Sequence, residues 1–481
     1  MNASHSAGGP TTAYRSPLLS QTLSIAVPAV AAVLQGESLS SSLKRALELT
    51  AAPPLSGHST AAGSNALTQA ETAAVMGAAV RDLCYNTLRD YGVVDVLTDR
   101  LARGDLEPVV RALIYCALGE LIRRPTTAHA VVDQAVQAAV LLRRVRAKGL
   151  VNAVLRQFLR QKQNLLLQLH QTDSGRYHHP QWWVDHLRQS HPDDWQNILA
   201  EAEVHPPMTL RVNQRRGNVV RSLERMKQAG IAVRDSSSQP PSDCPISPIV
   251  LERALPVTRL PGFAEGEVSV QDAGAQLAAY LLDTQPGMRV LDACAAPGGK
   301  AAHVLELVDC QLLAMDVDAQ RSQRIQENLT RLGLQAQLVV GDATDPKTEG
   351  LPTGMQFDRI LADVPCTASG VVRRHPDIRW LRRAGDIAGF AAQQARLLEA
   401  LWPRLVAGGK LLYVTCSVFP EENSQQIQQF LRLHPDAVDL DCASTPLPRA
   451  LGMRADGQLL PSPEHDGFFY ALLAKRFEAK C

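Results

Sequence analysis

The sequence lacks any closely spaced pair of cysteines of the kind that binds metals or forms a redox centre. Its nine cysteines are scattered, with no Cys-x-x-Cys pair and no His/Cys spacing suited to zinc. An odd, dispersed set of cysteines is typical of a reducing compartment and argues against a disulfide scaffold. We therefore expect no metal site and no disulfide framework.

Long hydrophobic runs are missing as well. The apolar stretch Leu23–Leu34 follows a single basic residue, Arg15, contains Ser24 and Pro28, and leads directly into a polar helical pattern. No run reaches the roughly 18 apolar residues that a membrane span needs. These features predict a cytoplasmic protein that does not associate with membranes.

A large excess of charge of either sign is also absent, because 49 basic and 48 acidic residues leave a formal net charge of +1. Basic residues nevertheless gather in two places. The first basic cluster comprises Arg143, Arg144, Arg146, Lys148, Arg156, Arg160 and Lys162, and the second comprises Arg373, Arg374, Arg379, Arg382 and Arg383. Such clusters can neutralise phosphates, although each by itself is equally typical of a solvated helix face.

The length of 481 residues, with 45% hydrophobic and 20% charged residues, indicates two or three soluble globular domains. We predict an α/β protein with an all-α N-terminal domain, a small α/β linker domain and a larger C-terminal α/β domain. The predicted limits are a disordered tail over 1–20, the helical domain over 21–165, the linker domain over 166–262 and the C-terminal domain over 263–481.

Helical periodicity dominates the N-terminal domain. A helix is predicted over Thr68–Tyr91, where Thr68 and Glu71 have capping-box spacing, and another opens with Pro108 in its first turn. Residues 129–161 predict two more helices, and residues 51–65 a long loop.

The linker domain has a mixed pattern. It predicts a strand over Thr209–Asn213, a helix over Val219–Ala229, a second strand near Ile231 and a loop over Ser236–Pro248.

From about residue 263, short apolar runs alternate with helical stretches. The runs are Arg289–Ala295, Gln311–Val317, Ala336–Asp342, Phe357–Asp363 and Gly409–Cys416, and a last strand is predicted from Gly467. This alternation predicts a parallel sheet with helices on both faces. Such sheets bind ligands at the carboxyl ends of their strands.

Three predicted strand ends carry residues suited to an adenosine-containing ligand. LDACAAPGGK, residues Leu291–Lys300, provides small residues and glycines that let the backbone approach a ligand before a helix starts. Asp316, at the end of the second strand, can accept hydrogen bonds from ribose hydroxyls. Asp318 next to it is better explained as the N-cap of a helix that Gly333 ends. Asp342, at the end of the third strand, is placed to contact an adenine.

Two cysteines follow the next two predicted strands. Cys366 lies in ADVPCTASG beside Asp363, and Cys416 lies in TCSVFPEEN. A thiolate can add to carbon 6 of a pyrimidine and so make carbon 5 nucleophilic enough to accept a methyl group. A free cysteine is more often a small buried hydrophobe. The position of both residues at the ligand-binding edge favours a chemical role.

Four motifs together resemble the RNA cytosine-5 methyltransferase family (the Nol/Nop/Sun group). They are CAAPGGK from Cys294, DVPCT from Asp363, RRHPDIRW from Arg373 and TCSVFPEEN from Thr415. VQDAGAQ from Val270 is similar to the segment that precedes the family's cofactor loop. The segment KGLVNAVLRQF from Lys148 resembles a NusB-like RNA-binding domain, and this fusion is similar to bacterial members that act on small-subunit ribosomal RNA.

The resemblance implies a Rossmann-like catalytic domain, S-adenosyl-L-methionine as cofactor, ribosomal RNA as partner and a monomer. It implies Cys416 as nucleophile and Cys366 as the cysteine that assists product release. Asp363 would lie beside the cofactor and the target base, and Lys300 would position the base or the developing charge. The implied cofactor-binding residues are Cys294, Ala295, Ala296, Pro297, Gly298, Gly299, Lys300, Asp316, Asp342 and Asp363. Departures at Val364, Thr367 and Gly274 remove no reacting group.

Three other functions remain open. A DNA cytosine-5 methyltransferase would use Cys366 as its nucleophile and would not need Cys416. A non-catalytic RNA-binding or ribosome assembly factor could keep the methyltransferase fold. A small-molecule methyltransferase would not need the two preceding domains or the basic clusters. The paired cysteines favour the RNA enzyme, but the sequence does not identify which cytidine is modified.

Overall fold

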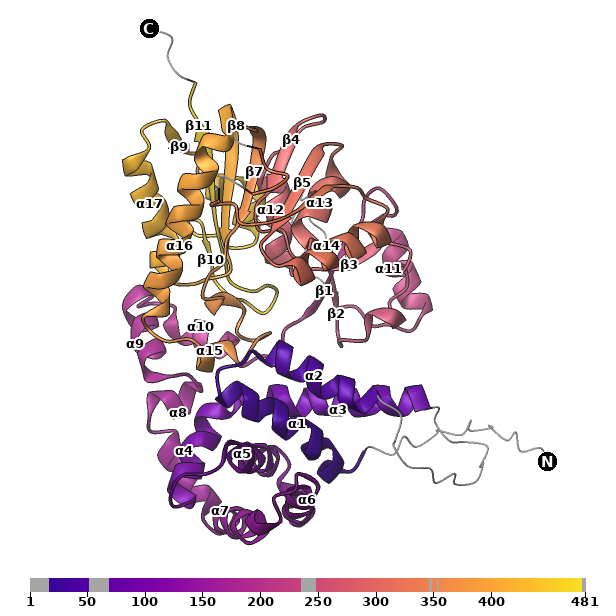
Figure 1. Cartoon of the computed structure of the whole chain (residues 1–481), viewed down its shortest axis with the longest axis vertical. Coiled ribbons are helices and arrows are strands. Elements are labelled where there is room, and N and C mark those ends of the chain that lie inside the picture. Colours follow the sequence, from indigo (N-terminus) through magenta and orange to yellow (C-terminus); the bar gives the residue numbers. More distant parts are fainter. Residues whose placement is uncertain (1–16, 52–68, 235–247, 346–347, 353, 478–481) are drawn as a thin grey trace, which may run out of the picture. The chain divides into compact units, whose positions relative to one another are not determined.

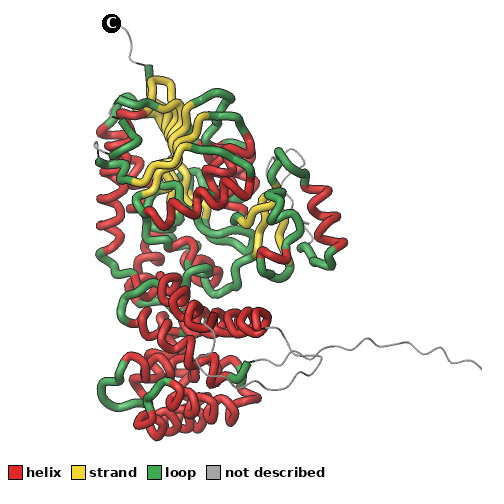
Figure 2. The backbone as a smooth tube through the Cα atoms, turned by 45° about the vertical axis from the view of Figure 1, so that its right-hand side comes forward, coloured by secondary structure: helices red, strands yellow, loops and turns green. Residues whose placement is uncertain are grey.

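The structure, a computed structural model, describes residues 17–51, 69–234, 248–345, 348–352 and 354–477. Most of the predicted tail, the loop 52–65, Thr68 and the loop 236–247 lie outside these residues. The chain divides into two units, residues 1–180 and 181–481. The tube in Figure 2 shows helices joined by loops, and no strand, in the described part of the first unit, whereas the second unit contains two separate sheets. The domain limits predicted at residues 165 and 262 stay predictions.

The first unit is a helical bundle built around one buried helix, α5. Helix α5 begins at Pro108, as predicted, and every residue from Ala112 to Leu121 is buried. Helices α1, α3, α4, α6 and α7 pack around it (Figure 1). The helices are α1 (Leu19–Leu34), α2 (Leu39–Ala51), α3 (Gln69–Arg89), α4 (Tyr91–Leu101), α5 (Pro108–Arg123), α6 (Ala128–Leu141), α7 (Lys148–Leu169) and α8 (Asp173–Tyr177). None of the helices in the described residues is long and apolar enough to cross a membrane.

The helix predicted over Thr68–Tyr91 ends earlier than expected. Helix α3 stops at Arg89 and α4 begins at Tyr91, so that Asp90 stands between them. Arg123 of α5 forms an ion pair with Asp90 and donates a hydrogen bond to the carbonyl of Asn86 at 3.1 Å. This long-range contact at the junction could not be anticipated from local periodicity. The two helices predicted within 129–161 are confirmed as α6 and α7.

The second unit begins with two helices and a small sheet. Helices α9 (Gln181–Ser190) and α10 (Trp195–Glu201) precede β1 (Met208–Val212), α11 (Val219–Gln228), β2 (Ile249–Leu251) and β3 (Val268–Val270). The strands pair antiparallel in the order β2-β1-β3. The strand predicted near Ile231 is wrong, because only Val233 makes a single bridge, to Leu251. Ile231 instead packs its side chain against the core of this small sheet.

The larger sheet has eight strands within the described residues. Its order is β10-β11-β8-β7-β4-β5-β6, and β9 pairs with β11. The strands are β4 (Arg289–Asp292), β5 (Gln311–Asp316), β6 (Gln337–Val340), β7 (Phe357–Asp363), β8 (Leu405–Thr415), β9 (Ala437–Asp439), β10 (Gln458–Leu459) and β11 (Phe468–Lys475). The five predicted parallel strands are confirmed, but β11 runs antiparallel to β8, which makes the sheet mixed.

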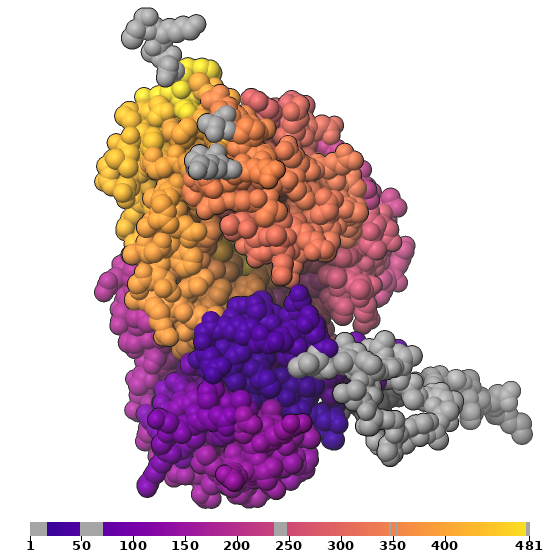
Figure 3. All heavy atoms as spheres, in the orientation of Figure 1, coloured from indigo at the N-terminus to yellow at the C-terminus, as the bar shows by residue number. Residues whose placement is uncertain are grey.

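Helices cover both faces of this sheet, as predicted. Helices α12 (Ala273–Leu281), α13 (Gly299–Leu307) and α14 (Ala319–Leu332) pack on one face, and α16 (Asp386–Leu401) and α17 (Ser424–Leu433) pack on the other. Two short helices, α15 (Ile378–Leu381) and α18 (Pro446–Ala450), lie in connections. Alternate side chains of each strand enter the two cores, so that Leu412 faces one core and Tyr413 the other. On the face shown in Figure 3, side chains fill the space between the ribbons of Figure 1.

Strand order fixes the place of a binding site. From β4 the chain adds β5 and β6 on one side, and then crosses to add β7 and β8 on the other. Because the connections leave β4 in opposite directions, a crevice opens at the carboxyl ends of β4, β5 and β7.

Candidate active site

A cavity of about 290 Å³ occupies this crevice. Its walls come from the turns that follow β4, β5, β6, β7 and β8, and from α16. The lining residues are Ala293, Cys294, Ala296, Asp316, Val317, Arg321, Gly341, Asp342, Ala343, Asp363, Val364, Pro365, Cys366, Ala368, Gln393, Leu397 and Cys416. Five strand ends far apart in the sequence therefore meet around one space.

The structure brings most of the predicted site residues to this cavity. Cys294, Ala296, Asp316, Asp342, Asp363, Cys366 and Cys416 all line it. Ala295, Pro297, Gly298, Gly299 and Lys300 do not, because they form the turn behind the wall and the first turn of α13. Gly298 has a φ of 94°, and a Cβ there would lie 3.1 Å from Ile325 of α14. A glycine is therefore needed for this turn to pack against α14.

Asp316 is the buried carboxylate of the site. It is 3% exposed and accepts hydrogen bonds from the backbone N–H of Ala296 at 3.0 Å and of Asp318 at 3.1 Å. Arg321, which the sequence analysis missed, donates to the carbonyl of Ala296 at 3.1 Å and lies 3.6 Å from Asp316. The sequence feature that could have identified Arg321 is its position in the first helical turn after the Asp318 N-cap. That cap and the end of α14 at Gly333 are confirmed.

Asp342 lies two residues beyond β6 rather than at its end. Its carboxylate accepts hydrogen bonds from the backbone N–H and the hydroxyl of Thr344, both at 2.8 Å. The side chain is thus held by its own turn while it lines the cavity wall.

Lys300 and Asp363 form an ion pair at the cavity wall. The Lys300 Nζ atom lies 2.6 Å from an Asp363 oxygen, and the ammonium also lies 5.7 Å from the centre of the Phe468 ring. Burial acts to lower the pKa of Lys300, but the negative charges around it, with Asp363 foremost, together outweigh burial and the pKa is raised. The charge of Cys416 acts in the same direction, which places a stable cation close to this thiol.

The two cysteines predicted to act together are in contact. The Sγ atoms of Cys366 and Cys416 lie 3.4 Å apart, one following β7 and the other β8. Cys366 is 8% exposed, and its pKa is raised by the hydrogen bond with Cys416 and then by burial. The contact with Cys416 and burial thus favour the protonated form of Cys366, and either sulfur can act as the donor in this pair.

Comparison with known proteins shows which family has the sequence that forms this site. Residues 279–474 match the family described as 16S rRNA methyltransferase RsmB/F, residues 179–258 match its ferredoxin-like domain, and residues 24–160 match the NusB family. A ribosomal RNA small subunit methyltransferase B of Serratia proteamaculans is 42% identical over 403 residues, which cover 83% of this chain and 90% of the relative. The chain belongs to the RsmB/F methyltransferase family. The Escherichia coli protein of the same name is also 42% identical, with the same coverage.

Two solved structures extend the comparison beyond the RsmB/F sequences. The structure titled PH0851 covers 95% of this chain and 99% of its own, with a TM-score of 0.72 and 23% identity, and so supports the fold alone. A methyltransferase homolog protein from Pyrococcus horikoshii covers 65% of this chain and 99% of its own, with a TM-score of 0.52 and 29% identity. The resemblance and the three-part fold inferred from sequence are thus confirmed.

The cavity of this RsmB/F member fits the cofactor of a methyltransferase. Its volume is near the lower end of small-ligand sites. Asp316, Asp342 and Asp363 line it together with Arg321, so that carboxylates outnumber cations in the lining, which suits a ligand that carries a sulfonium and an ammonium. Among the described residues, no group of three or more His, Cys, Asp or Glu side chains could hold a metal ion.

A further acid, Asp292, supports this fit. It ends β4, is 1% exposed, and its carboxyl group has a pKa raised to about 8 by burial and then by the charge of Asp363. Lys300 opposes this shift. A cationic ligand in the neighbouring cavity would favour the ionised form of Asp292. Asp292 lies within the motif LDACAAPGGK, but its burial beside Asp363 and Lys300 could not be predicted from that motif.

We expect Asp292→Asn to stabilise the ligand-free protein increasingly as pH rises. The folded state holds a proton on Asp292 up to about pH 8, whereas the unfolded state releases it near the ordinary carboxyl pKa. Wild-type stability therefore falls as pH rises through this window, by up to about 1.4 kcal/mol per pH unit, and the asparagine removes this fall. Thermal unfolding of both proteins from pH 5 to pH 8 measures the difference. A difference that does not change with pH would contradict the assignment.

The second basic cluster does not have the role predicted for it. Arg373 and Arg379 are 1% and 0% exposed. Arg373 lies 2.5 Å from Asp466 and 3.5 Å from Glu201, while Arg379 pairs with Glu203. Arg374 pairs with Asp272 and Asp466. The expectation that these arginines hold phosphates is wrong for Arg373, which is enclosed with its acidic partners inside the fold. Arg374 is 27% exposed and is already paired with two acids distant in the sequence.

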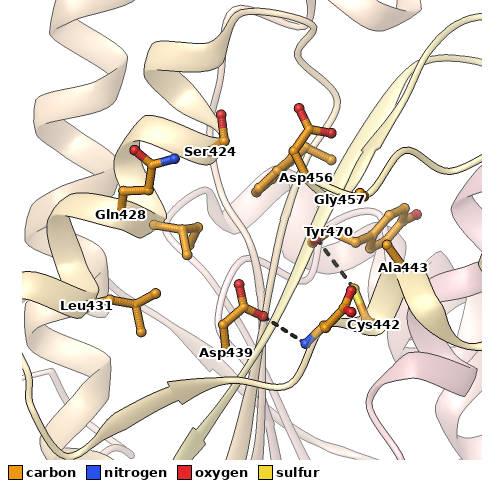
Figure 4. A pocket seen from close by; sticks show the side chains of 13 residues that line it. Ser424, Gln428, Leu431, Asp439, Cys442, Ala443, Asp456, Gly457 and Tyr470 are labelled. Atoms are coloured by element: carbon orange, nitrogen blue, oxygen red, sulfur yellow. Dashed lines mark hydrogen bonds between the residues drawn. The ribbon is translucent and has the colours of Figure 1, made fainter.

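A second cavity, of about 170 Å³, lies elsewhere in this unit between α17, β9 and β11 (Figure 4). Asp439, Asp456 and Gln428 border it, and the Cys442 thiol donates a hydrogen bond to the carbonyl of Tyr470 at 3.5 Å. None of the predicted site residues lines it. Burial raises the pKa of Cys442 to about 12, so this thiol is unsuited to act as a nucleophile.

Proposed function

We propose that this protein transfers a methyl group from S-adenosyl-L-methionine to carbon 5 of a cytidine in small-subunit ribosomal RNA, through a covalent adduct with Cys416. The observation that carries the proposal is the contact between the thiols of Cys366 and Cys416 at the wall of the acidic cavity. Family membership supports the reaction class, and the names of the relatives support the substrate.

We assign the cofactor to the cavity at the carboxyl ends of β4, β5, β6 and β7. Asp316 would accept the ribose hydroxyls and Asp342 would lie at the adenine side. The loop Cys294–Lys300 would hold the methionine part, with its small residues allowing close approach. Asp363 would lie between cofactor and base, since it lines the cavity and is held by Lys300 at 2.6 Å. When bound, the cofactor supplies an electrophilic methyl group on its sulfonium.

The proposed reaction begins with attack of the Cys416 sulfur on carbon 6 of a cytosine that has left its base stack. Lys300, whose raised pKa keeps it charged, would stabilise the negative charge that develops on the ring. Carbon 5 then accepts the methyl group and loses its proton to a base. The bond between sulfur and carbon 6 breaks, which restores the ring double bond and the free cysteine. Cys366, in contact with Cys416, would assist this release.

The first unit offers a surface for the RNA backbone. In contrast with Arg373 and Arg379 of the second basic cluster, five members of the first are exposed, namely Arg143, Arg146, Lys148, Arg156 and Arg160. Arg144 pairs with Glu107 at 2.5 Å and Lys162 donates to the carbonyl of Leu121 at 2.7 Å. The exposed members lie around the α6–α7 connection and along α7. Contacts of this kind position an RNA without reading its sequence and weaken with salt.

The test is a methylation assay with the full-length protein. Tritiated S-adenosyl-L-methionine is incubated with small-subunit ribosomal RNA that lacks the modification, and with assembled particles, and the labelled nucleoside is identified. We expect 5-methylcytidine at one position. Label in DNA or in free nucleosides alone would support another methyltransferase class, and RNA binding without transfer to any substrate would support an assembly factor. Cytoplasmic localisation and a monomeric state stay predictions.

A further inference from the structure

Directly beneath the two thiols lies a cluster of buried polar side chains. Glu422, Thr367, Ser417 and Gln394 are each 0% exposed, and Ser369 is 2% exposed. Thr367 directly follows Cys366 in the sequence, and Ser417 directly follows Cys416. The cluster therefore joins the loop after β7 to the loop after β8 at the point where each carries its cysteine.

Glu422 is the centre of this cluster. One of its carboxylate oxygens accepts hydrogen bonds from the backbone N–H of Thr367 at 2.8 Å and from the Gln394 amide at 3.1 Å. The other accepts from the hydroxyls of Thr367 and Ser417, both at 2.5 Å. A single carboxylate thus holds both cysteine-bearing loops, and all four of its partners act as donors.

The choice of a carboxylate has a physical reason. Burial raises the pKa of Glu422, while the hydrogen bonds from Ser417, Thr367 and Gln394 oppose this shift by favouring the ionised form. Four donors converge on two oxygens, an arrangement that an ionised carboxylate satisfies completely. The negative charge also raises the pKa of Cys366. Glu422 thereby favours the state in which Cys366 keeps its proton beside Cys416.

Other contacts between the two loops involve uncharged groups. The backbone N–H of Gly370 donates to the carbonyl of Cys416 at 2.8 Å, and the N–H of Val418 donates to the Ser369 hydroxyl at 2.9 Å. These bonds fix the backbones of the loops. They do not act on the backbone N–H of Thr367, the residue next to Cys366, which donates to Glu422. The Thr367 hydroxyl also donates to Glu422, and it lies 3.2 Å from the Ser417 hydroxyl of the other loop.

We propose that Glu422 is a positioning residue that keeps the sulfur atoms of Cys366 and Cys416 in contact. The inference rests on the proposed function, in which one thiol forms the adduct and the other assists its release. Loss of the carboxylate leaves these four buried donors without this acceptor, so that the loops move apart to find other partners. The thiols would then be present but no longer adjacent.

Phenylarsine oxide measures the thiol spacing without RNA or cofactor. Its trivalent arsenic forms two sulfur–arsenic bonds, and its oxygen leaves as water with the two thiol protons. Tight binding requires two adjacent thiols. We expect the full-length wild type to bind it, and Cys366→Ala in the same chain gives the background from the other cysteines. Glu422→Ala should weaken the Cys366-dependent binding by about tenfold or more.

Two variants control for a general loss of structure. Glu422→Gln keeps an oxygen for the Thr367 N–H, and its amide can donate to the two hydroxyls, so its arsenical affinity should lie between those of the wild type and the alanine variant. Glu421→Gln makes the same change one residue earlier, where Glu421 lies 3.2 Å from His186, and should bind as the wild type does. If Glu422→Gln binds phenylarsine oxide no better than Glu422→Ala does, the negative charge of Glu422 is what keeps the two thiols adjacent.

A second readout separates positioning from folding. With the ribosomal RNA in which the wild type forms 5-methylcytidine, Glu422→Ala should give more covalent protein–RNA complex relative to methylated product. The reason is that release of the adduct depends on Cys366, whereas attack on carbon 6 depends on Cys416. Unchanged arsenical affinity in a folded Glu422→Ala protein would overturn the inference. A different result would be that the wild type methylates no RNA while Glu422→Ala still loses arsenical binding. That result would overturn the proposed function and support the positioning role of Glu422.

Discussion

Cys416→Ala is expected to abolish methyl transfer to RNA while leaving the fold and cofactor binding intact. The variant removes the atom that would bond to carbon 6. Cys366 lines the same cavity, but it is more buried than Cys416 and its pKa is raised, which makes it the poorer nucleophile. Removal of a covalent nucleophile lowers turnover on the order of 10⁴-fold or more in other enzymes. Tritium transfer to ribosomal RNA, measured beside cofactor affinity, tests this result.

Cys366→Ala should behave in the opposite way. Cys416 can still attack and the methyl group can still pass to carbon 5, but release of the adduct is slowed because the neighbouring thiol is absent. The protein should therefore remain attached to its RNA and migrate as a labelled complex on a denaturing gel. The complex should disappear in the double variant, because Cys416 is needed to form it.

Cys442→Ala is the matched control for both variants. Cys442 is buried like Cys366, but it lies beside the second cavity and bonds to the Tyr470 carbonyl. It should transfer methyl groups at the wild-type rate and trap no RNA. If Cys416→Ala stays active while Cys366→Ala is inactive, the nucleophile is Cys366 and the chemistry is of the DNA cytosine-5 type.

The residues around the cofactor cavity could be predicted because they follow strands directly. Alternating apolar runs give the strand ends, and parallel strands place their carboxyl ends at one edge. Asp316, Asp363, Cys366 and Cys416 therefore needed no knowledge of tertiary contacts to be brought together. The antiparallel direction of β11 could not be predicted from this pattern, because an apolar run indicates a strand but not the direction in which it pairs.

Partners separated by many residues could not be predicted. Glu422 stood within a quoted motif, but its hydrogen bonds to Thr367 depend on the packing of two loops 55 residues apart. Arg373 was read as a surface cation because its neighbours in sequence are basic. Its partner Asp466 lies 93 residues away, and only the folded chain brings the two charges together. Local charge patterns therefore gave the wrong environment for this cluster.

Arg373→Ala should destabilise the second unit strongly rather than weaken RNA binding selectively. Arg373 and Asp466 are each 1% exposed, and their atoms lie 2.5 Å apart. The guanidinium also donates to the carbonyl of Ser462 at 2.7 Å. Removing one partner of a buried ion pair typically costs about 3–5 kcal/mol, because the remaining charge loses its compensation.

The same pair links three parts of the second unit that surround the active site. Asp466 accepts from Arg373 and Arg374, and its backbone N–H donates to Asp272, the N-cap of α12, at 3.1 Å. Arg373→Lys keeps the charge but cannot reproduce the planar set of donors, so its stability should lie between those of wild type and Arg373→Ala. Arg383→Ala removes an exposed arginine of the same cluster and should change stability by less than about 0.5 kcal/mol.

Guanidinium unfolding and salt-dependent RNA binding together decide between the two roles of Arg373. A buried structural pair predicts a large fall in the unfolding midpoint of Arg373→Ala and, under conditions where the variant is folded, an unchanged dependence of RNA affinity on salt. A phosphate contact predicts the reverse, with unchanged stability and a salt slope reduced by about 1. Because the arginine is enclosed by Asp466 and Glu201, we expect the first pattern, with Arg383→Ala close to wild type in stability.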